Sequence, residues 1–77
     1  MAITVLFFGQ LVEITGQRQL TIPEAAGTAE LKEKLSALYP ALQDMVVNIA
    51  VNTVIVNEDT ALEPGSTVAM LPPFSGG

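Results

Sequence analysis

The C-terminal residues are the part of this sequence whose types and spacing suggest chemistry. Residues 71–77 read Leu-Pro-Pro-Phe-Ser-Gly-Gly. Pro72 and Pro73 favour an extended backbone and have no backbone N–H to donate to a neighbouring strand. We therefore expect residues 72–77 to leave the domain as a tail. Gly76 and Gly77 have no Cβ and therefore fit a channel too narrow for other residues. At roughly 3.3 Å per residue the tail reaches about 20 Å, enough to enter a pocket of another protein.

The α-carboxylate of Gly77 is the chemical group at the tip of this tail. A free α-carboxylate is ionised at neutral pH and inert toward nucleophiles, so it must first become a better electrophile, such as an acyl-adenylate. The chain is therefore expected not to be a catalyst alone: another enzyme activates Gly77. Ser75 and Gly76 would form the narrow neck and Phe74 an anchor in the partner, unless Phe74 packs back on its own sheet. A frayed or truncated end is the alternative explanation of the two glycines.

Missing residue types exclude most other chemistry. The chain has no cysteine and no histidine, so it has no thiolate nucleophile, no imidazole base and no sulfur or imidazole ligand for a metal. We expect no metal site. The net charge of −5, with three basic residues against eight acidic ones, argues against a nucleic-acid partner. The acidic charge suits either steering toward a positively charged partner or ordinary solubility.

Composition indicates one small folded domain spanning residues 1–77. Hydrophobic residues are 49% of the 77 and charged residues 14%, which is too apolar for a disordered segment and too interrupted for a membrane span of about 20 apolar residues. The apolar run Val5–Phe8 is short and no Lys or Arg precedes it, so it does not resemble a signal peptide. We expect a cytoplasmic protein with no membrane partner.

Hydrophobic periodicity predicts one helix among several strands. Residues 3–8 read as a strand, and residues 17–22 as its antiparallel partner after a turn-like stretch at 13–16. Thr28 is the expected N-cap of a helix that ends at Tyr39 before Pro40. Three leucines at i, i+4 and i+7 share the face of this helix that would cover the sheet: Leu31, Leu35 and Leu38. On its solvent side we expect an ion pair between Glu30 and Lys34.

The second half of the chain predicts three further strands. A linker at 41–44 precedes strands at 46–51 and 54–56, and a turn at 63–65 precedes a strand at 66–71. The sequence thus predicts an α+β fold in which one helix packs on a mixed sheet of four to five strands.

Strand alternation leaves apolar side chains without a cover. If Ile3, Val5 and Phe7 face the helix, a period of two turns Leu6 and Phe8 to the opposite face. The last strand adds Leu71, and the strand at 54–56 adds Ile55, to an exposed patch typical of a protein-binding surface. The alternative is that the loop at 9–16 folds over the patch with three apolar side chains: Leu11, Val12 and Ile14.

Three segments of the chain resemble one known family. They are the ending Gly65-x-x-Val68-Ala69-x-x-Pro72-Pro73-x-Ser75-Gly76-Gly77, the opening Val5-Leu6-Phe7-Phe8-Gly9, and Ala50-Val51-Asn52. They are similar to the small subunits of molybdopterin synthases, which are ubiquitin-like sulfur carriers of β-grasp fold. The resemblance runs through essentially the whole chain, and the Pro-Pro-x-Ser-Gly-Gly ending is its most specific part.

The resemblance implies a chemistry and two partners. A ubiquitin-activating-like adenylyltransferase would use ATP to adenylate Gly77, which becomes a thiocarboxylate. The tail would then enter the large subunit of molybdopterin synthase and donate sulfur to the dithiolene of molybdopterin. No cofactor would be bound by the chain itself. Phe8, Ile55 and Leu71 occupy the apolar positions with which such subunits hold their partner.

Some features of the sequence differ from the family pattern. Val12 stands where members often carry Arg, and Ser66 where they usually carry Asp, so contacts through those side chains are in doubt. The related carrier for thiazole synthesis also ends in Gly-Gly but usually lacks the Pro-Pro-x-Ser stretch. The sequence of a carrier for a tungsten form of the cofactor would show the same features as that of a molybdenum one. A ubiquitin-like binding module that never modifies its end remains the alternative from a different class.

Overall fold

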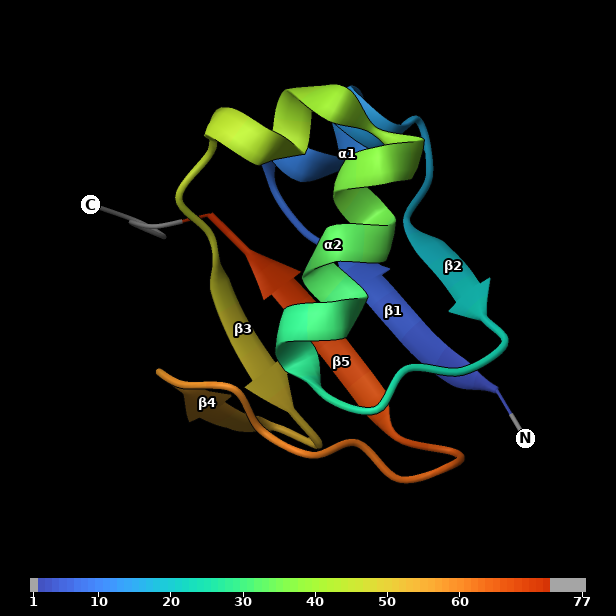
Figure 1. Cartoon of the computed structure of the whole chain (residues 1–77). Helices are drawn as coiled ribbons and strands as arrows, with labels where there is room; N and C mark the ends of the chain where they lie inside the picture. The colour runs from blue at the N-terminus through green and yellow to red at the C-terminus, as the bar shows by residue number, and fades with distance from the viewer. Residues whose placement is uncertain (1, 73–77) are drawn as a thin grey trace.

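One long helix lies across a five-stranded sheet in the computed structural model, which describes residues 2–72 (Figure 1). The elements in chain order are β1 Ile3–Phe7, α1 Gln10–Thr15, β2 Gln19–Ile22, α2 Thr28–Leu38, a 3-10 helix Pro40–Asp44, β3 Asn48–Val51, β4 Val54–Val56 and β5 Thr67–Leu71. The predicted α+β fold of one main helix on a mixed sheet is confirmed.

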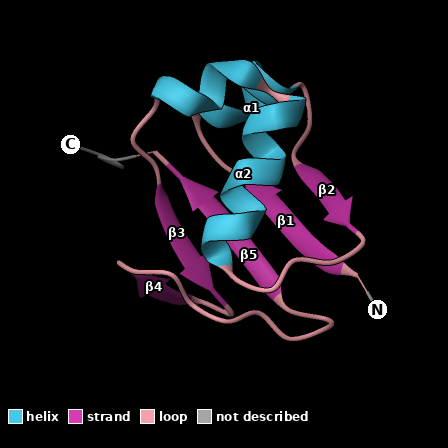
Figure 2. Cartoon of the chain, viewed as in Figure 1, coloured by secondary structure: helices cyan, strands magenta, loops and turns pink. Residues whose placement is uncertain are grey.

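The sheet has the strand order β2-β1-β5-β3-β4 (Figure 2). β1 and β5 pair in parallel, whereas β1 with β2, β5 with β3 and β3 with β4 pair antiparallel. The predicted pairing of the first two strands is therefore confirmed. Because β1 and β5 are parallel, their carboxyl ends lie at the same end of the sheet. The chain thus leaves β5 beside the point where it leaves β1.

The core lies between the sheet and α2, as the alternation predicted. Ile3, Val5 and Phe7 of β1 are buried at every second position, while the residues between them are half-buried. The inward residues of β5 and the buried leucines of α2 complete this layer: Val68, Met70, Leu31 and Leu35. Each fully buried aliphatic side chain of this kind contributes about 1.5–3 kcal/mol to folding.

The start of α2 differs from the prediction. Gly27, not Thr28, precedes the helix and supplies no side-chain cap. Oδ1 of Asp59 instead accepts the N–H of Ala29 at 3.1 Å, and the Thr28 hydroxyl accepts the N–H of Thr60 at 3.0 Å. A segment far along the chain therefore caps this helix, which local sequence could not indicate. A Cβ on Gly27 would lie 2.6 Å from the same Asp59 oxygen, so a side chain at position 27 would displace the carboxylate that caps α2.

Two side-chain predictions for α2 were wrong. Leu38 is 57% exposed, and the half-buried Tyr39 instead packs on the core, with its ring edge-on to Phe7 at 6.3 Å between centroids.

Glu30 and Lys34 bind the preceding loop instead of each other. The Glu30 carboxylate accepts the N–H of Ala26, and Lys34 Nζ donates to the carbonyl of Glu24 at 2.5 Å.

The segment after β1 also differs, because it forms the short helix α1 where turn-like structure was predicted. Six residues are too few to show helical periodicity. Gly16 ends α1 in the left-handed conformation, at φ 74°, and donates its N–H to the carbonyl of Val12. The predicted linker at 41–44 is a 3-10 helix, and the strands expected at 3–8, 46–51 and 66–71 are each shorter by one or two residues.

Candidate functional site

The outer face of the sheet, opposite α2, carries the predicted patch. Pairing places one residue of each strand in a continuous row across this face. In strand order the row is Gln19, Leu6, Ala69, Ala50 and Ile55. Leu6 and Ile55 therefore belong to the same row, and the shorter alanine side chains lie between them.

The rows on either side of this one differ in polarity. Toward the start of β1 the register aligns Thr21, Thr4 and Thr67, all polar. Toward the end of β5, Leu71 pairs with Asn48, and Phe8 follows the last residue of β1. The apolar residues thus concentrate at the end of the sheet where β5 ends. We call Leu6, Phe8, Ala69, Leu71, Ala50 and Ile55 the apolar outer surface.

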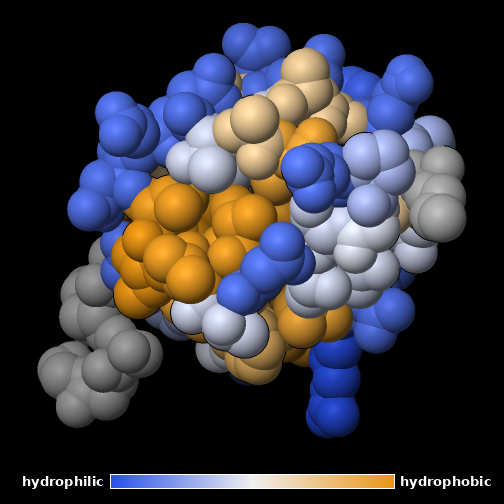
Figure 3. All heavy atoms as spheres, turned by 90° about the horizontal axis from the view of Figure 1, so that it is seen from below, coloured by the Kyte–Doolittle hydropathy of each residue, from blue (hydrophilic) through white to orange (hydrophobic). Residues whose placement is uncertain are grey.

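The larger side chains of the apolar outer surface are accessible to a partner, whereas Ala50 is buried. Phe8 is 44% and Ile55 58% exposed, and Leu6 and Leu71 are half-buried. Val54 is also exposed, but its pairing with Val51 places it on the other face of the sheet, so it does not belong to this surface. Seen from below, hydrophobic side chains gather on the side of the molecule that carries β4, with hydrophilic residues around them (Figure 3).

Helix α1 does not fold over this surface, so the alternative prediction, in which residues 9–16 cover the patch, is wrong. Leu11 is fully buried in the core, and Ile14 packs against the core as well. Val12 lines a surface groove of about 480 Å³ together with Leu6 and Phe8. The side chain at position 12 thus borders the apolar outer surface and leaves it open.

Ser66, the second residue that differs from the family pattern, has a structural role in this fold. Ser66 is buried, and its hydroxyl accepts the N–H of Glu63 at 3.1 Å. Its own N–H donates to the Glu63 carbonyl at 3.0 Å, which closes the predicted turn, and Gly65 has the positive φ, 87°, that such a turn requires. Ser66 therefore stabilises the turn that leads into β5.

Pro72, the first residue of the predicted tail, lies at the end of the sheet that carries the apolar outer surface. Pro72 follows directly on β5 and is half-buried. Its ring approaches Gly9, a residue whose contact with the tail the sequence reasoning missed. The remaining predicted tail residues, Pro73, Phe74, Ser75, Gly76 and Gly77, lie outside the described residues, so their predicted roles are not tested.

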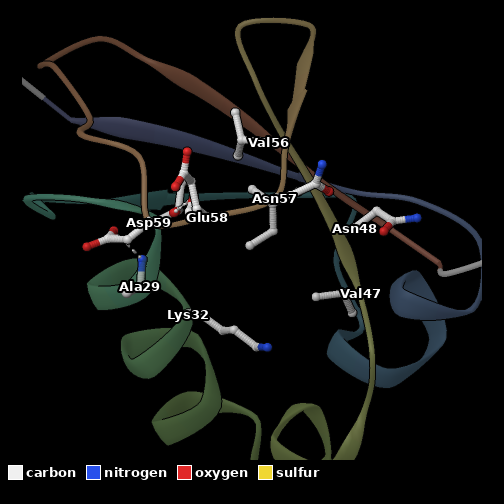
Figure 4. Close-up of a pocket in the computed structure, with 10 residues that line it drawn as sticks. Ala29, Lys32, Val47, Asn48, Val56, Asn57, Glu58 and Asp59 are labelled. Carbon is white, nitrogen blue, oxygen red and sulfur yellow. Dashed lines mark hydrogen bonds between the residues drawn. The ribbon is translucent and has the colours of Figure 1, made fainter.

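A second hollow, of about 300 Å³, lies between α2 and β3 (Figure 4). Lys32 extends toward the β3 side of this hollow. At the start of α2, Oδ1 of Asp59 accepts the N–H of Ala29. The polar groups of Asp59 and Thr28 already serve the start of α2. Within residues 2–72 no three side chains form a group that could hold a metal ion, and no helix could cross a membrane. This hollow is therefore a weaker candidate than the outer face.

Comparison with known proteins agrees with this geometry. The ThiS family matches residues 5–77. Molybdopterin synthase sulfur carrier subunits are 34% identical to the chain: the Caenorhabditis elegans protein over 100% of this chain and 99% of its own length, and the human protein over 97% and 93%.

Solved structures show the same fold. A putative molybdopterin converting factor subunit 1 from Pyrococcus furiosus superposes with a TM-score of 0.86 at 27% identity, covering 96% of this chain and 99% of that one. A chain from the complex of subunits 1 and 2 of the Helicobacter pylori molybdopterin-converting factor gives a TM-score of 0.75 at 28% identity, with both chains fully covered. The predicted ubiquitin-like β-grasp fold is therefore confirmed.

Proposed function

The chain belongs to the ThiS family, and on that premise we propose that it is the sulfur carrier of a molybdopterin synthase. The observation that carries the proposal is the position of Pro72: the chain leaves the sheet beside an accessible apolar surface. One partner can therefore hold the domain and receive the tail from the same side. Relatives named as sulfur carrier subunits, matched along essentially their whole length, support the same assignment.

The proposed chemistry takes place at Gly77. A carboxylate oxygen attacks the α-phosphate of ATP, and pyrophosphate leaves as the acyl-adenylate forms. A sulfide-equivalent donor then attacks the carbonyl carbon, and AMP leaves with the bonding electron pair. The product is a thiocarboxylate, whose sulfur bonds to a carbon of the pterin precursor as an oxygen substituent leaves that carbon. Water then cleaves the resulting thioester, which leaves the sulfur on the pterin and restores the carboxylate of Gly77. A ubiquitin-activating-like adenylyltransferase carries out the first step, because a free α-carboxylate is inert toward nucleophiles until it is activated.

The proposed partner contacts divide into a docking surface and a thread. Leu6, Phe8, Ile55 and Leu71 dock against the large subunit, and residues 72–76 thread Gly77 into its active site. Phe8 and Ile55 are about half exposed, so burial of either contributes roughly 1 kcal/mol before the costs of association are subtracted. The Helicobacter pylori complex of subunits 1 and 2 supports the choice of a large subunit as the partner.

Mass spectrometry tests the chemistry directly. The protein is incubated with the activating enzyme, ATP and a sulfide source, and its intact mass is measured. We expect a gain of about 16 Da, the difference between a sulfur and an oxygen atom. An unchanged mass with an enzyme that loads a known carrier would contradict the proposal and favour the unmodified binding module.

A second experiment separates the two kinds of carrier. The loaded protein is mixed with the large subunit of molybdopterin synthase and its precursor, or with a thiazole synthase and its substrates. Sulfur transfer only in the first mixture is the expected result. Transfer only in the second would assign the chain to thiazole synthesis.

A further inference from the structure

Gly9 lies where β1 ends, in contact with the residue from which the tail starts. Its backbone has φ 58° and ψ −138°, a combination that is readily accessible only to glycine. A Cβ built on Gly9 would lie 2.7 Å from Cγ of the Pro72 ring and 3.6 Å from Cδ. The first distance is shorter than real Cβ contacts, so any side chain at position 9 forces one of the two residues to move.

Gly9 is held in place by backbone hydrogen bonds on both sides. The N–H of Phe8 donates to the carbonyl of Met70 at 3.3 Å, which extends the pairing of β1 with β5 by one residue. The N–H groups of Leu11 and Val12 donate to the carbonyls of Phe8 and Gly9, each at 3.1 Å. A shift of Gly9 would therefore break bonds that join β1, β5 and α1.

Pro72 is the residue that would have to move instead. Its ring closes on its own backbone nitrogen, so Cγ cannot rotate away as the end of a flexible side chain can. Leu71, immediately before it, is paired with Asn48 in the β5–β3 ladder. A displacement of the ring would therefore turn the backbone at residue 72, just after the last residue that the sheet fixes.

We propose that Gly9 is a positioning residue for sulfur transfer: its missing side chain seats Pro72 against the end of β1 and sets the direction of the tail. This inference rests on the proposed function. Five residues reach at most about 16 Å, so a tilt of about 20° at residue 72 can displace their end by up to about 6 Å. Misplacement of a reacting group by only 1 Å can lower a rate about 100-fold, so this contact controls delivery of Gly77.

A double variant at Gly9 and Pro72 separates the contact from backbone strain, because it keeps the strain at position 9 and removes the Pro72 ring. Gly16→Ala controls for adding a Cβ at a left-handed glycine. Gly9→Ala introduces a Cβ against Pro72. Gly16→Ala introduces a Cβ at another positive φ, 74°, where nothing lies within 4 Å. Pro72→Ala removes Cγ and Cδ, so the double variant Gly9→Ala/Pro72→Ala relieves the clash. If the contact is the cause, the effect of Gly9→Ala will be much smaller in the Pro72→Ala background.

The direction of the tail is measured without any activity. Because the chain has no cysteine, Ser75→Cys accepts a single nitroxide label, whose effect on backbone amide signals maps the part of the domain near the tail. We expect Gly9→Ala to move this footprint and Gly16→Ala to leave it unchanged, with amide spectra showing an intact sheet in both. A footprint in Gly9→Ala equal to that of the parent, or equally displaced in Gly16→Ala, would overturn the inference.

Kinetics of sulfur loading, on chains without the label, complete the test. We expect Gly9→Ala to lower kcat for thiocarboxylate formation by about tenfold or more, with KM for the carrier within about twofold, since the substitution alters the contact with Pro72 and no other surface side chain. A rise in KM with kcat unchanged would contradict a positioning role. If the parent chain gains no sulfur, the proposed function fails, whereas the nitroxide footprint still decides whether Gly9 directs the tail.

Discussion

Leu6 of β1 and Ile55 of β4 lie in one row on the outer face of the sheet, with Ala69 and Ala50 between them. The two residues are 49 positions apart in the sequence. The strand order brings them into one apolar surface, at the end of the sheet where the tail begins. A partner that contacts both therefore also lies close to Pro72.

A charge on the apolar outer surface should weaken partner capture. For Leu71→Glu we expect the dissociation constant for the large subunit to rise at least tenfold, because a carboxylate would have to be buried in the interface. The measurement is isothermal titration calorimetry with thermal unfolding of the free variant alongside. Thr4→Glu, on the polar row, is the control and should bind within about twofold of the parent. Extensive unfolding of Leu71→Glu would show that Leu71 belongs to the core.

Removal of Gly76 and Gly77 should abolish sulfur loading and leave the domain folded. The strands and helices that the structure describes all lie between residues 3 and 71, so the deletion removes none of them. Intact-mass spectrometry after incubation with the activating enzyme, ATP and sulfide should show no gain in mass, while the unfolding midpoint stays that of the parent. Sulfur gain by the shortened chain would place the reactive group elsewhere.

The cap that Asp59 provides for α2 should contribute measurably to stability. Asp59→Ala removes the acceptor for the Ala29 N–H, and we expect the free energy of unfolding to fall by about 1 kcal/mol. Urea denaturation followed by circular dichroism measures this loss. Asp44→Ala, which removes the same charge from an exposed position after α2, should change stability by less than about 0.5 kcal/mol. Equal losses in both variants would indicate a charge effect instead of a cap.

The two leucines at the C-terminal half of α2 should differ strongly in their contributions. Leu35 is fully buried and Leu38 is 57% exposed. We expect Leu35→Ala to cost about 2–5 kcal/mol through lost burial and the cavity it leaves, and Leu38→Ala less than about 0.5 kcal/mol. Chemical denaturation of both variants gives the comparison. A large loss in Leu38→Ala would mean that its side chain packs against the domain in solution.

The alternation of strand residues could be predicted because burial with a period of two is a local property of the chain. The inward set of β1, the outward Leu6 and Phe8, and the turn at 63–65 all follow from neighbours in sequence. The Pro-Pro-x-Ser-Gly-Gly ending likewise carries its chemical suggestion in the order of its residues. These features required no knowledge of which strands pair.

The tertiary structure alone decided the features that join distant segments. Asp59 replaces Thr28 as the cap of α2, Tyr39 packs on the core while Leu38 is exposed, and Gly9 meets Pro72. Each depends on the chain returning to the same place after tens of residues or on the ends of parallel strands lying together. The residue types determined what the tail and the outer face are made of. Strand pairing determined that Pro72 and the outer face lie at the same end of the sheet, since hydrogen-bond register between strands remote in sequence sets their relative positions.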